Sequence, residues 1–259
     1  MSRVHDALKR AEMGGMLPPE ETPAYPAEPV PISDLRPPET PVNGSASTAA
    51  SAGPVMTPAV PSGPLRLNIH PSMLSEVQVV PFSPAPESHL LDLNNSHETP
   101  AEEFRTLRTR LNHLQSLQPL HTIVVTSPSP AEGKTFTAVN LALAQAHLAE
   151  SSVLLGDFDL RRPIVHNLFQ IDRAPGLSDY LTGQCTFAQA IRRVEAMNLY
   201  LLPAGSPVKN PLELLNMRQA KLLFEELPRS FNWAVFDTPP LLFSADANLL
   251  STMADGTIL

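Results

Sequence analysis

The sequence has little of what several classes of protein require. Cys185 is its single cysteine, which excludes an internal disulfide and an iron–sulfur or multi-thiolate metal site within one chain. No apolar run reaches the roughly 18–20 residues of a membrane-spanning helix, and the opening residues lack the apolar stretch of a secretion signal. Lys and Arg number 18 against 26 Asp and Glu, and this formal charge of −8 argues against broad nucleic-acid binding. We therefore expect a cytoplasmic protein that contacts a membrane only through a partner or a peripheral surface.

The N-terminal part of the chain offers little from which to build a core. Aromatic residues make up only 5 % of the sequence, and most of its 29 prolines fall between residues 18 and 86. Residues 1–13 predict a short amphipathic helix, because Val4, Leu8 and Ala11 recur on one side at helical spacing. A helix this short is marginal alone in water, so a docked helix and a fraying tail are equal alternatives.

Residues 14–98 are predicted to form a disordered or polyproline-like linker. Proline at this density blocks helices and removes strand donors, while Ala, Ser and Thr offer little apolar surface to bury. The brief apolar stretch Val77–Phe82 could lie against the folded domain as an edge strand. Plain linker is the preferred interpretation of this stretch.

Residues 99–259 carry the pattern of a folded domain. A helix is expected at 99–117, where apolar residues form one stripe: Phe104, Leu107, Leu111 and Leu114. Apolar strands are expected at 121–127, 151–159, 198–205, 232–240 and 255–259, and helices at 134–150, 218–227 and 245–253, with shorter helical pieces between them. This alternation predicts an α/β fold with a mainly parallel sheet covered on both faces. The carboxyl ends of the strands would then meet at one edge, where ligands bind.

The strongest motif is the loop SPSPAEGKT, Ser127–Thr135, between a predicted strand and a predicted helix. Such a loop wraps phosphates with backbone N–H groups at a helix N-terminus. Gly133, Lys134 and Thr135 supply its core, since the lysine reaches the β- and γ-phosphates and the hydroxyl ligates Mg²⁺. Pro128 stands where the first glycine of the pattern is usual. A structural turn that merely contains Gly-Lys-Thr is the alternative.

Two further motifs place carboxylates at strand ends. Asp157 and Asp159 end the second strand, where carboxylates can hold Mg²⁺ through water or accept a proton from an attacking hydroxyl. One of the two is expected to cap the next helix, and Asp157 is the better catalytic candidate. Arg161 and Arg162 could contact phosphate or an acidic partner, or lie in a solvated loop. Asp237 follows a buried strand and reads as a Walker B carboxylate directed at Mg²⁺.

These three motifs, in this order, resemble those of the bacterial tyrosine kinases, a P-loop family related to the septum-site and partitioning ATPases. The first motif of that family reads close to SPSPxEGKT and tolerates Pro128. Its DxDxR motif matches Asp157, Asp159 and Arg161, and its DxxP motif matches Asp237–Pro240. Two more stretches of the chain look like the family: GLSDYLTG at 176–183 and LPAGSPVKNPLELL at 202–215.

The resemblance covers about residues 99–259 and implies a P-loop NTPase fold of Rossmann-like, three-layer type that uses ATP and Mg²⁺. It implies an autophosphorylating tyrosine kinase that regulates synthesis and export of exopolysaccharide or capsule. The implied catalytic groups are Lys134, Asp157 and Asp159; the nucleotide-binding residues are Ser129, Ala131, Glu132, Gly133, Lys134, Thr135 and Phe136; the Mg²⁺ ligands are Thr135, Asp157 and Asp237.

The resemblance also implies partners. An ExxRxxR helix used in subunit contacts is matched by Glu102, Arg105 and Arg108, which suggests a homo-oligomer. From the residues alone, a solvated helix face with a local ion pair is the alternative. The opening residues and proline-rich linker look like the cytoplasmic form of these kinases. That form lacks its own transmembrane segment and is recruited to the inner face of the membrane by an adaptor of the chain-length-regulator family.

The sequence departs from the family at several points. Ala131 replaces a frequent glycine, and Gly156 replaces a bulky apolar residue. The C-terminal tyrosine cluster of the family has no counterpart, since the only tyrosines are Tyr25, Tyr180 and Tyr200. The chain also stops inside an expected strand, as a truncated chain would, and a full protein that lost its tail is the alternative. A nucleotide-dependent oligomerisation switch that hydrolyses ATP and phosphorylates nothing is therefore the alternative function. An iron–sulfur carrier is disfavoured because it needs paired cysteines, and a pure scaffold is least favoured.

Overall fold

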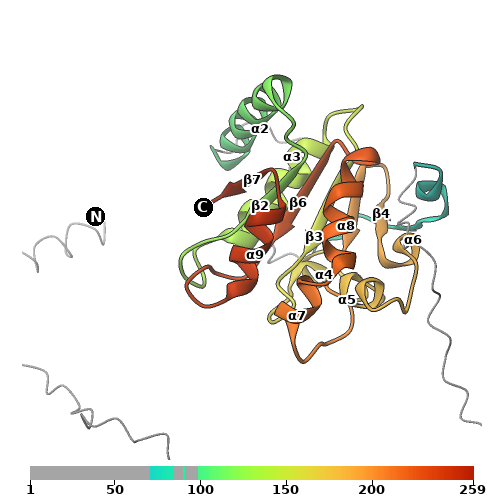
Figure 1. The fold of residues 1–259 in the computed structure, drawn as a ribbon. Helices are drawn as coiled ribbons and strands as arrows, with labels where there is room; N and C mark the ends of the chain where they lie inside the picture. The colour runs from blue at the N-terminus through green and yellow to red at the C-terminus, as the bar shows by residue number, and fades with distance from the viewer. Residues whose placement is uncertain (1–70, 85–89, 91–98) are drawn as a thin grey trace, which may run out of the picture. The chain divides into compact units, whose positions relative to one another are not determined.

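The computed structural model describes residues 71–84, 90 and 99–259, all within one compact unit (Figure 1). The predicted N-terminal helix, most of the predicted linker, and Tyr25 lie outside these residues. The strands are β1 (Gln78–Val80), β2 (Thr122–Val125), β3 (Val153–Asp157), β4 (Arg192–Val194), β5 (Leu199–Leu202), β6 (Trp233–Asp237) and β7 (Gly256–Ile258). The α-helices are α2 (Thr99–Leu117), α3 (Lys134–Ala146), α4 (Val165–Leu168), α5 (Leu177–Leu181), α6 (Phe187–Ala190), α7 (Pro211–Leu215), α8 (Arg218–Glu226) and α9 (Ala245–Met253), and the 3-10 helices are η2 (Pro71–Glu76) and η4 (Leu227–Arg229).

The strands form one mainly parallel sheet in the order β1-β4-β5-β3-β6-β2-β7, which confirms the predicted α/β fold. Strands β5, β3, β6, β2 and β7 run parallel, so their carboxyl ends share one edge. Strand β4 is antiparallel to β5, and β1 is parallel to β4. The expectation that all strands end at the same edge is therefore wrong for β1 and β4.

Alternating side chains along the central strands build two separate cores. In β6, Trp233 and Val235 join a cluster with α2 and α3, while Ala234 and Phe236 join the cluster formed by α5 to α9. Both sets are nearly inaccessible to solvent, as the continuous apolar strands predicted. The predicted three-layer arrangement is confirmed, with helices on both faces of the sheet (Figure 1).

The stretch that was preferentially interpreted as linker contributes to the sheet. Gln78 pairs with Arg192 and Val80 with Val194, and the Glu195 amide donates to the Val80 carbonyl at 2.8 Å. The adjacent Val77 is only 6 % exposed and belongs to the core under the sheet. This buried valine anchors the segment, so the edge-strand alternative is right for Gln78–Val80.

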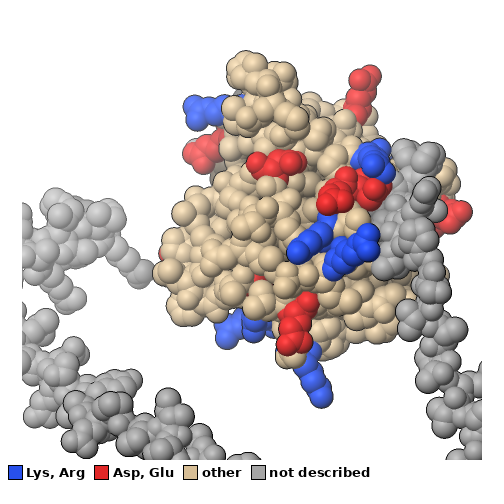
Figure 2. Space-filling model, viewed as in Figure 1, with Lys and Arg blue, Asp and Glu red and all other residues tan. Residues whose placement is uncertain are grey.

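The helices agree with their predicted positions, except at one end. Helix α2 has the predicted bounds, but α3 ends at Ala146 instead of residue 150. Its chain tightens there, because the Leu148 amide donates to the Gln145 carbonyl three residues back. Among the described residues, no helix has the length and apolarity needed to cross a membrane. On the face drawn in Figure 2, acidic and basic side chains intermingle over α8, so this face has no extended basic stripe for nucleic acid.

Candidate active site at the carboxyl ends of the parallel strands

The loop between β2 and α3 leaves the start of a long helix open. Gly133 occupies the N-cap position with φ 90°, and no side chain caps the helix. Its first N–H groups are therefore available to an anion, which a helix N-terminus attracts. Earlier in the loop, the Ser129 amide donates to Glu132 Oε2 at 2.9 Å, so the Glu132 carboxylate closes the turn between these two residues.

Two other residues predicted to bind nucleotide have distinct environments. Ala131 has φ 62°, the left-handed region that costs a residue with a Cβ about 1 kcal/mol. Phe136 is 37 % exposed and packs edge-on against Phe104 of α2, with ring centroids 5.9 Å apart. The loop therefore has a strained backbone at Ala131, and the helix that follows it packs through Phe136 against α2.

Lysine, hydroxyl and carboxylates predicted from three separate motifs meet at the tips of β2, β3 and β6. Lys134 Nζ lies 3.5 Å from Asp159 Oδ2 and 3.8 Å from Asp237 Oδ1. Thr135 Oγ1 donates a 2.7 Å hydrogen bond to Asp237 Oδ2 across 102 residues of sequence. The two carboxylate side chains are almost fully buried. Such a group of charges, at the sheet edge where ligands bind, is arranged for phosphate chemistry.

Asp157 does not face the lysine. Its Oδ2 accepts hydrogen bonds from the amides of Ile164 at 3.1 Å and Val165 at 3.0 Å, at the start of α4. Its Oδ1 accepts from the Asp159 amide at 3.3 Å. Of the two carboxylates, Asp157 is therefore the helix cap, and Asp159 is the one beside Lys134.

Burial makes the ionised carboxylates at this edge costly. Desolvation, with the nearby Asp237 charge, raises the pKa of Asp157 to about 8, despite the hydrogen bond from Val165. Desolvation also raises the pKa of Asp237 to about 6, although Lys134 and the Thr135 hydroxyl oppose the rise. Perturbed carboxyl groups grouped in this way are typical of functional sites.

The residues fit a magnesium ion that arrives with a nucleotide. Asp237 Oδ1 is buried and accepts no hydrogen bond in the described part of the chain, and the Thr135 hydroxyl is beside it. Within those same residues, no group of three or more His, Cys, Asp or Glu side chains could hold a metal alone. Mg²⁺ is commonly held by one or two protein oxygens together with phosphates and water, so the donor set is appropriate.

A buried aspartate that sequence reasoning missed ties the second motif to α9. Arg161 Nε donates to Asp246 Oδ2 at 2.8 Å, and its Nη2 to Oδ1 at 3.3 Å. Asp246 is 1 % exposed, and Ser244 caps the helix that carries it. Arg161 is thus a structural clamp, while the Arg162 amide donates to Asp159 Oδ1 at 3.0 Å. The Ser-x-Asp pattern at the start of α9 was the available signal.

The segment after β6 is bonded directly to the phosphate loop. The Leu241 amide donates to the Ser127 carbonyl at 2.9 Å, and the Leu242 amide to the Pro128 carbonyl at 3.3 Å. Thr126 Oγ1 also donates to the Pro239 carbonyl at 2.9 Å. The two loops therefore form one unit.

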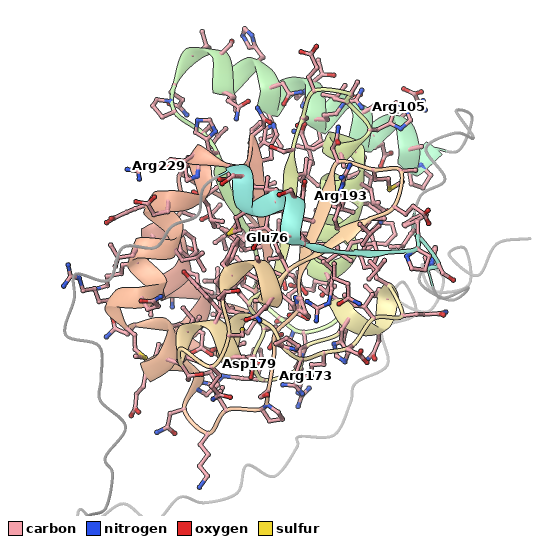
Figure 3. The ribbon with its side chains drawn as sticks, turned by 90° about the vertical axis from the view of Figure 1, so that its right-hand side faces the viewer. Glu76, Arg105, Arg173, Asp179, Arg193 and Arg229 are labelled. Carbon is pink, nitrogen blue, oxygen red and sulfur yellow. The ribbon has the colours of Figure 1, made fainter. Side chains whose placement is uncertain are left out.

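The other two stretches that resemble the family also meet. Asp179 Oδ2 accepts from the Gly176 amide at 2.8 Å and the Ser206 amide at 3.1 Å. Arg173 Nε donates to the Gly205 carbonyl at 2.7 Å (Figure 3). A Cβ at Gly205 would lie 2.7 Å from Asp179 Oδ2, so glycine is required for this close approach. These hydrogen bonds join α5 to the segment that follows β5.

The predicted interface residues have partners within the chain. Arg105 forms an ion pair with Glu102 one turn away in α2. Arg108 Nη1 donates to the Ala144 carbonyl of α3 at 3.0 Å. The local ion pair that sequence reasoning gave as the alternative is present, and subunit contacts through this helix stay a prediction.

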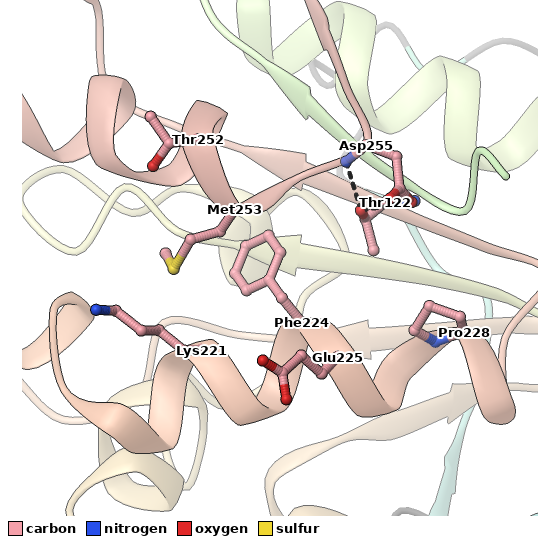
Figure 4. A pocket seen from close by; sticks show the side chains of 8 residues that line it. All are labelled: Thr122, Lys221, Phe224, Glu225, Pro228, Thr252, Met253 and Asp255. Atoms are coloured by element: carbon pink, nitrogen blue, oxygen red, sulfur yellow. Dashed lines mark hydrogen bonds between the residues drawn. The ribbon is translucent and has the colours of Figure 1, made fainter.

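A separate pocket of about 520 Å³ between α8 and α9 is not part of this site (Figure 4). It lies near Thr122 and Asp255, whose polar groups bond to one another: the Asp255 amide donates to Thr122 Oγ1 at 2.9 Å. Lys221, Glu225 and Thr252 also line it, but none of the residues predicted to bind nucleotide or Mg²⁺ does, so we place the active site at the strand tips.

Comparison with known proteins points in one direction, although no protein-family model matches the sequence. The chain is 36 % identical over 159 residues to the tyrosine-protein kinase YwqD of Bacillus subtilis, covering 61 % of this chain and 67 % of that protein. It is 34 % identical over 183 residues to the tyrosine-protein kinase Ptk of Acinetobacter johnsonii, covering 66 % of this chain but 25 % of that protein. The crystal structure of the chimerical protein CapA2B2 superposes with a TM-score of 0.62 at 30 % identity, over 72 % of this chain and 80 % of that one. The chain thus spans about two thirds of YwqD and a quarter of Ptk.

Proposed function

Because this chain belongs to the bacterial tyrosine kinase family, we propose that it transfers the γ-phosphoryl group of ATP to tyrosine hydroxyls, including those of its own kind. In this reaction the tyrosine oxygen bonds to the γ-phosphorus, the bond from that phosphorus to the ADP oxygen breaks, and the hydroxyl proton passes to a carboxylate. The observation that carries the proposal is the meeting of Lys134, Thr135, Asp159 and Asp237 at one sheet edge.

Each group has a role that follows from its position. The open amides before α3 would hold the phosphates, and Lys134 would offset the negative charge that develops during transfer. Thr135 and Asp237 would hold Mg²⁺, which would supply positive charge against the phosphates. Phosphoryl transfer depends mostly on positioning and electrostatics, so this arrangement is sufficient without a covalent intermediate.

The two aspartates of the second motif would divide their tasks. Asp159, beside Lys134, would accept the tyrosine proton or orient the metal's water. Asp157 would act as a positioning residue, because it holds the start of α4 through two amides. This reverses the preference drawn from the sequence, in which Asp157 was the better catalytic candidate and a metal ligand.

The wider role we propose is regulation of exopolysaccharide or capsular polysaccharide synthesis and export, as a homo-oligomer recruited to the inner membrane face by a chain-length-regulator adaptor. Support comes from the family membership, and for a paired membrane adaptor from the CapA2B2 chimera as a structural relative. Glu102, Arg105 and Arg108 would contribute to the subunit contact after exchanging their partners within the chain.

One observation favours the alternative of a nucleotide-dependent switch. Both tyrosines within the described residues are buried: Tyr180 is 5 % exposed and packs against Phe187, and Tyr200 is 7 % exposed and packs against Phe231. Burial raises the pKa of the Tyr180 hydroxyl above its ordinary value. Neither can reach a neighbouring active site while the domain is folded, so a kinase must find its acceptor elsewhere.

Tandem mass spectrometry after incubation with ATP and Mg²⁺ tests the proposal, with Lys134→Ala as the inactive variant. A tyrosine-rich peptide is added, so that the outcome does not depend on an acceptor within the chain. Phosphotyrosine on the chain or peptide, absent from Lys134→Ala, is the expected result. Release of ADP with no phosphotyrosine on either would establish the switch instead. Lys221→Ala, an exposed lysine on α8, is the matched control and should retain activity.

A further inference from the structure

A buried arginine at the edge of the sheet has no carboxylate partner. Arg192 lies in β4, next to the edge strand β1, and is 6 % exposed. Its Nη1 donates to the carbonyls of Gln189 at 2.7 Å and Ile191 at 3.0 Å. Among the described residues, no carboxylate forms an ion pair with it, and its Nε–H and Nη2–H groups have no acceptor. A cation buried to this extent ordinarily has an anionic partner.

The free side of this guanidinium borders a pocket of about 450 Å³. The pocket is bordered by η2 and β1 on one side and by α6 and the loop before it on the other. Five of its eight lining residues are polar or charged, namely Glu76, Gln78, Gln184, Gln189 and Arg192, and the others are Pro175, Cys185 and Ala188. Figure 3 looks onto this edge and labels Glu76 and the neighbouring Arg193. The volume suits a small organic molecule better than a bare ion.

The acidic side chains nearby do not neutralise Arg192. Glu76 is exposed at the rim, and Asp172 lines an adjoining pocket of about 340 Å³ that Arg192 also borders. Burial lowers the pKa of Arg192, while Asp172 and Cys185 oppose this. A guanidinium keeps its charge even so, and the charge stays uncompensated within the pocket.

We propose that this pocket binds a small hydroxylated anion, a sugar acid or a sugar phosphate. Nε–H and Nη2–H are parallel donors on one edge of a planar fork, the geometry that grips two oxygens of a carboxylate or phosphate. The amides of Gln78, Gln184 and Gln189 supply donors and acceptors for hydroxyl groups. Gln189 Oε1 is occupied by the Thr186 amide at 2.9 Å, which leaves its NH₂ group for the ligand.

This site is independent of the phosphate loop. None of Gly133, Lys134, Thr135, Asp159 and Asp237 lines it, and it lies at the β1–β4 edge and not at the tips of β2, β3 and β6. The proposal therefore stands whether the chain is a kinase or a switch.

The chain carries its own reporter for the test. Cys185 is the single cysteine in the sequence, is half-buried, and lines this pocket. Alkylation by iodoacetamide, followed by intact mass on the full chain, measures access to the pocket without reference to kinase activity. Glucuronate and glucose 1-phosphate are the two anionic probes, and glucose is the neutral one. Each anion at ten times its dissociation constant should slow alkylation roughly tenfold by mass action, while glucose at the same concentration should not.

Three variants locate the effect. Arg192→Met should abolish protection by the anions. Arg193→Met is the matched control, because this neighbour on β4 is exposed, does not line the pocket, and should leave protection unchanged. Glu76→Gln should strengthen protection by the anions, because it removes a negative charge from the rim of the pocket. Glu76→Gln also keeps the test valid if Arg192→Met fails to fold, which its melting temperature reports.

The outcomes separate cleanly. Protection by only one anion supports the site and identifies its head group as carboxylate or phosphate. No protection by either anion, or equal protection by glucose, would overturn the proposal. So would anion protection that survives in a folded Arg192→Met variant, or is unchanged by Glu76→Gln.

Discussion

Carboxylates at the two ends of the central strands have pKa values shifted in opposite directions. At the amino end of β2, Asp255 Oδ2 accepts hydrogen bonds from the His121 amide at 2.9 Å and from the Thr122 amide and hydroxyl at 2.8 and 2.9 Å. Burial would raise the pKa of Asp255, but these donors outweigh it, so its pKa lies below the ordinary value. At the carboxyl ends, Asp157 and Asp237 have raised pKa values, and one oxygen of Asp237 has no donor in the described residues. The carboxylate with the lowered pKa stabilises the fold, whereas the buried carboxylates with raised pKa values mark the candidate functional site.

The largest expected effect comes from removing one charge at the functional end. Asp237→Asn should lower phosphoryl transfer about 100-fold, because Mg²⁺ loses its charged oxygen, yet it should raise the free energy of unfolding by about 1 kcal/mol at pH 8, because a buried anion is removed. Single-turnover transfer to a peptide and urea unfolding measure the two. The oxygen of the new amide can still accept the hydrogen bond from Thr135. A loss of stability would therefore contradict the proposed difference between the two ends of the strands.

The pH dependence of stability tests the same difference between the carboxylates at the two ends of the strands. The folded-state pKa values of Asp157 and Asp237, about 8 and about 6, exceed the ordinary value near 3.8, so the folded state holds more protons between these limits. Stability should therefore fall as the pH rises from about 5 to about 8, by on the order of 2 kcal/mol. Urea unfolding across that range measures the slope.

Asp157→Asn should flatten most of this slope, since its carboxyl has the higher pKa. Its oxygen can still accept the Ile164 and Val165 amides. A slope unchanged in this variant would show that other groups cause it. Asp255 should contribute nothing in this window, because its lowered pKa makes its stabilising effect disappear only in acid, below about pH 4.

A smaller effect is expected at the structural end. Asp255→Asn should destabilise the domain by about 1 kcal/mol, since charge-assisted hydrogen bonds are weakened at a site that solvent partly screens. Transfer activity should stay within twofold of the parent by the same assay, about 0.4 kcal/mol in barrier. A loss of activity comparable to that of Asp237→Asn would mean that the two ends are not separable.

The smallest effect concerns the backbone of the phosphate loop. Ala131→Gly should change stability by less than about 0.5 kcal/mol, because relief of the left-handed conformation is offset by the greater freedom of glycine in the unfolded chain. Ala131→Val is the counterpart and should cost more than about 1 kcal/mol, because a β-branched residue is disfavoured at positive φ. Thermal melting of both variants checks this, and a tolerated valine would contradict the observed φ.

Sequence reasoning located the elements whose pattern is local. Helix α2 and strands β2, β3, β5, β6 and β7 follow from apolar runs and stripes, and the motifs at their ends follow from strand order. Strand β4 escaped detection because its three residues include two arginines, and β1 was only the less favoured interpretation of its segment because it lies among prolines. The pairing of β1 with β4 joins segments more than a hundred residues apart, which no local pattern contains.

Within the site, the sequence could name the participants but not divide their tasks. Which of Asp157 and Asp159 faces Lys134 depends on the path of the chain into α4, seven residues on. The unusual Gly156 has a related explanation: a Cβ there would lie 2.8 Å from the ring of Phe158, which packs at a tilt against Phe236 with ring centroids 4.6 Å apart. The ring of Phe158 thus supplies the bulk that is missing at Gly156.

The placement of β6 between β2 and β3 also dictates the order of events during synthesis. The loop Ser127–Thr135 is translated early, but the Thr135 hydroxyl bonds to Asp237, 102 residues later. Until β6 has left the ribosome, β2 and β3 have no strand to join them, and Lys134 has one of its two counter-charges missing. A nascent chain therefore lacks the assembled site at the strand tips, and the proposed phosphoryl transfer would begin only after the central strand is inserted.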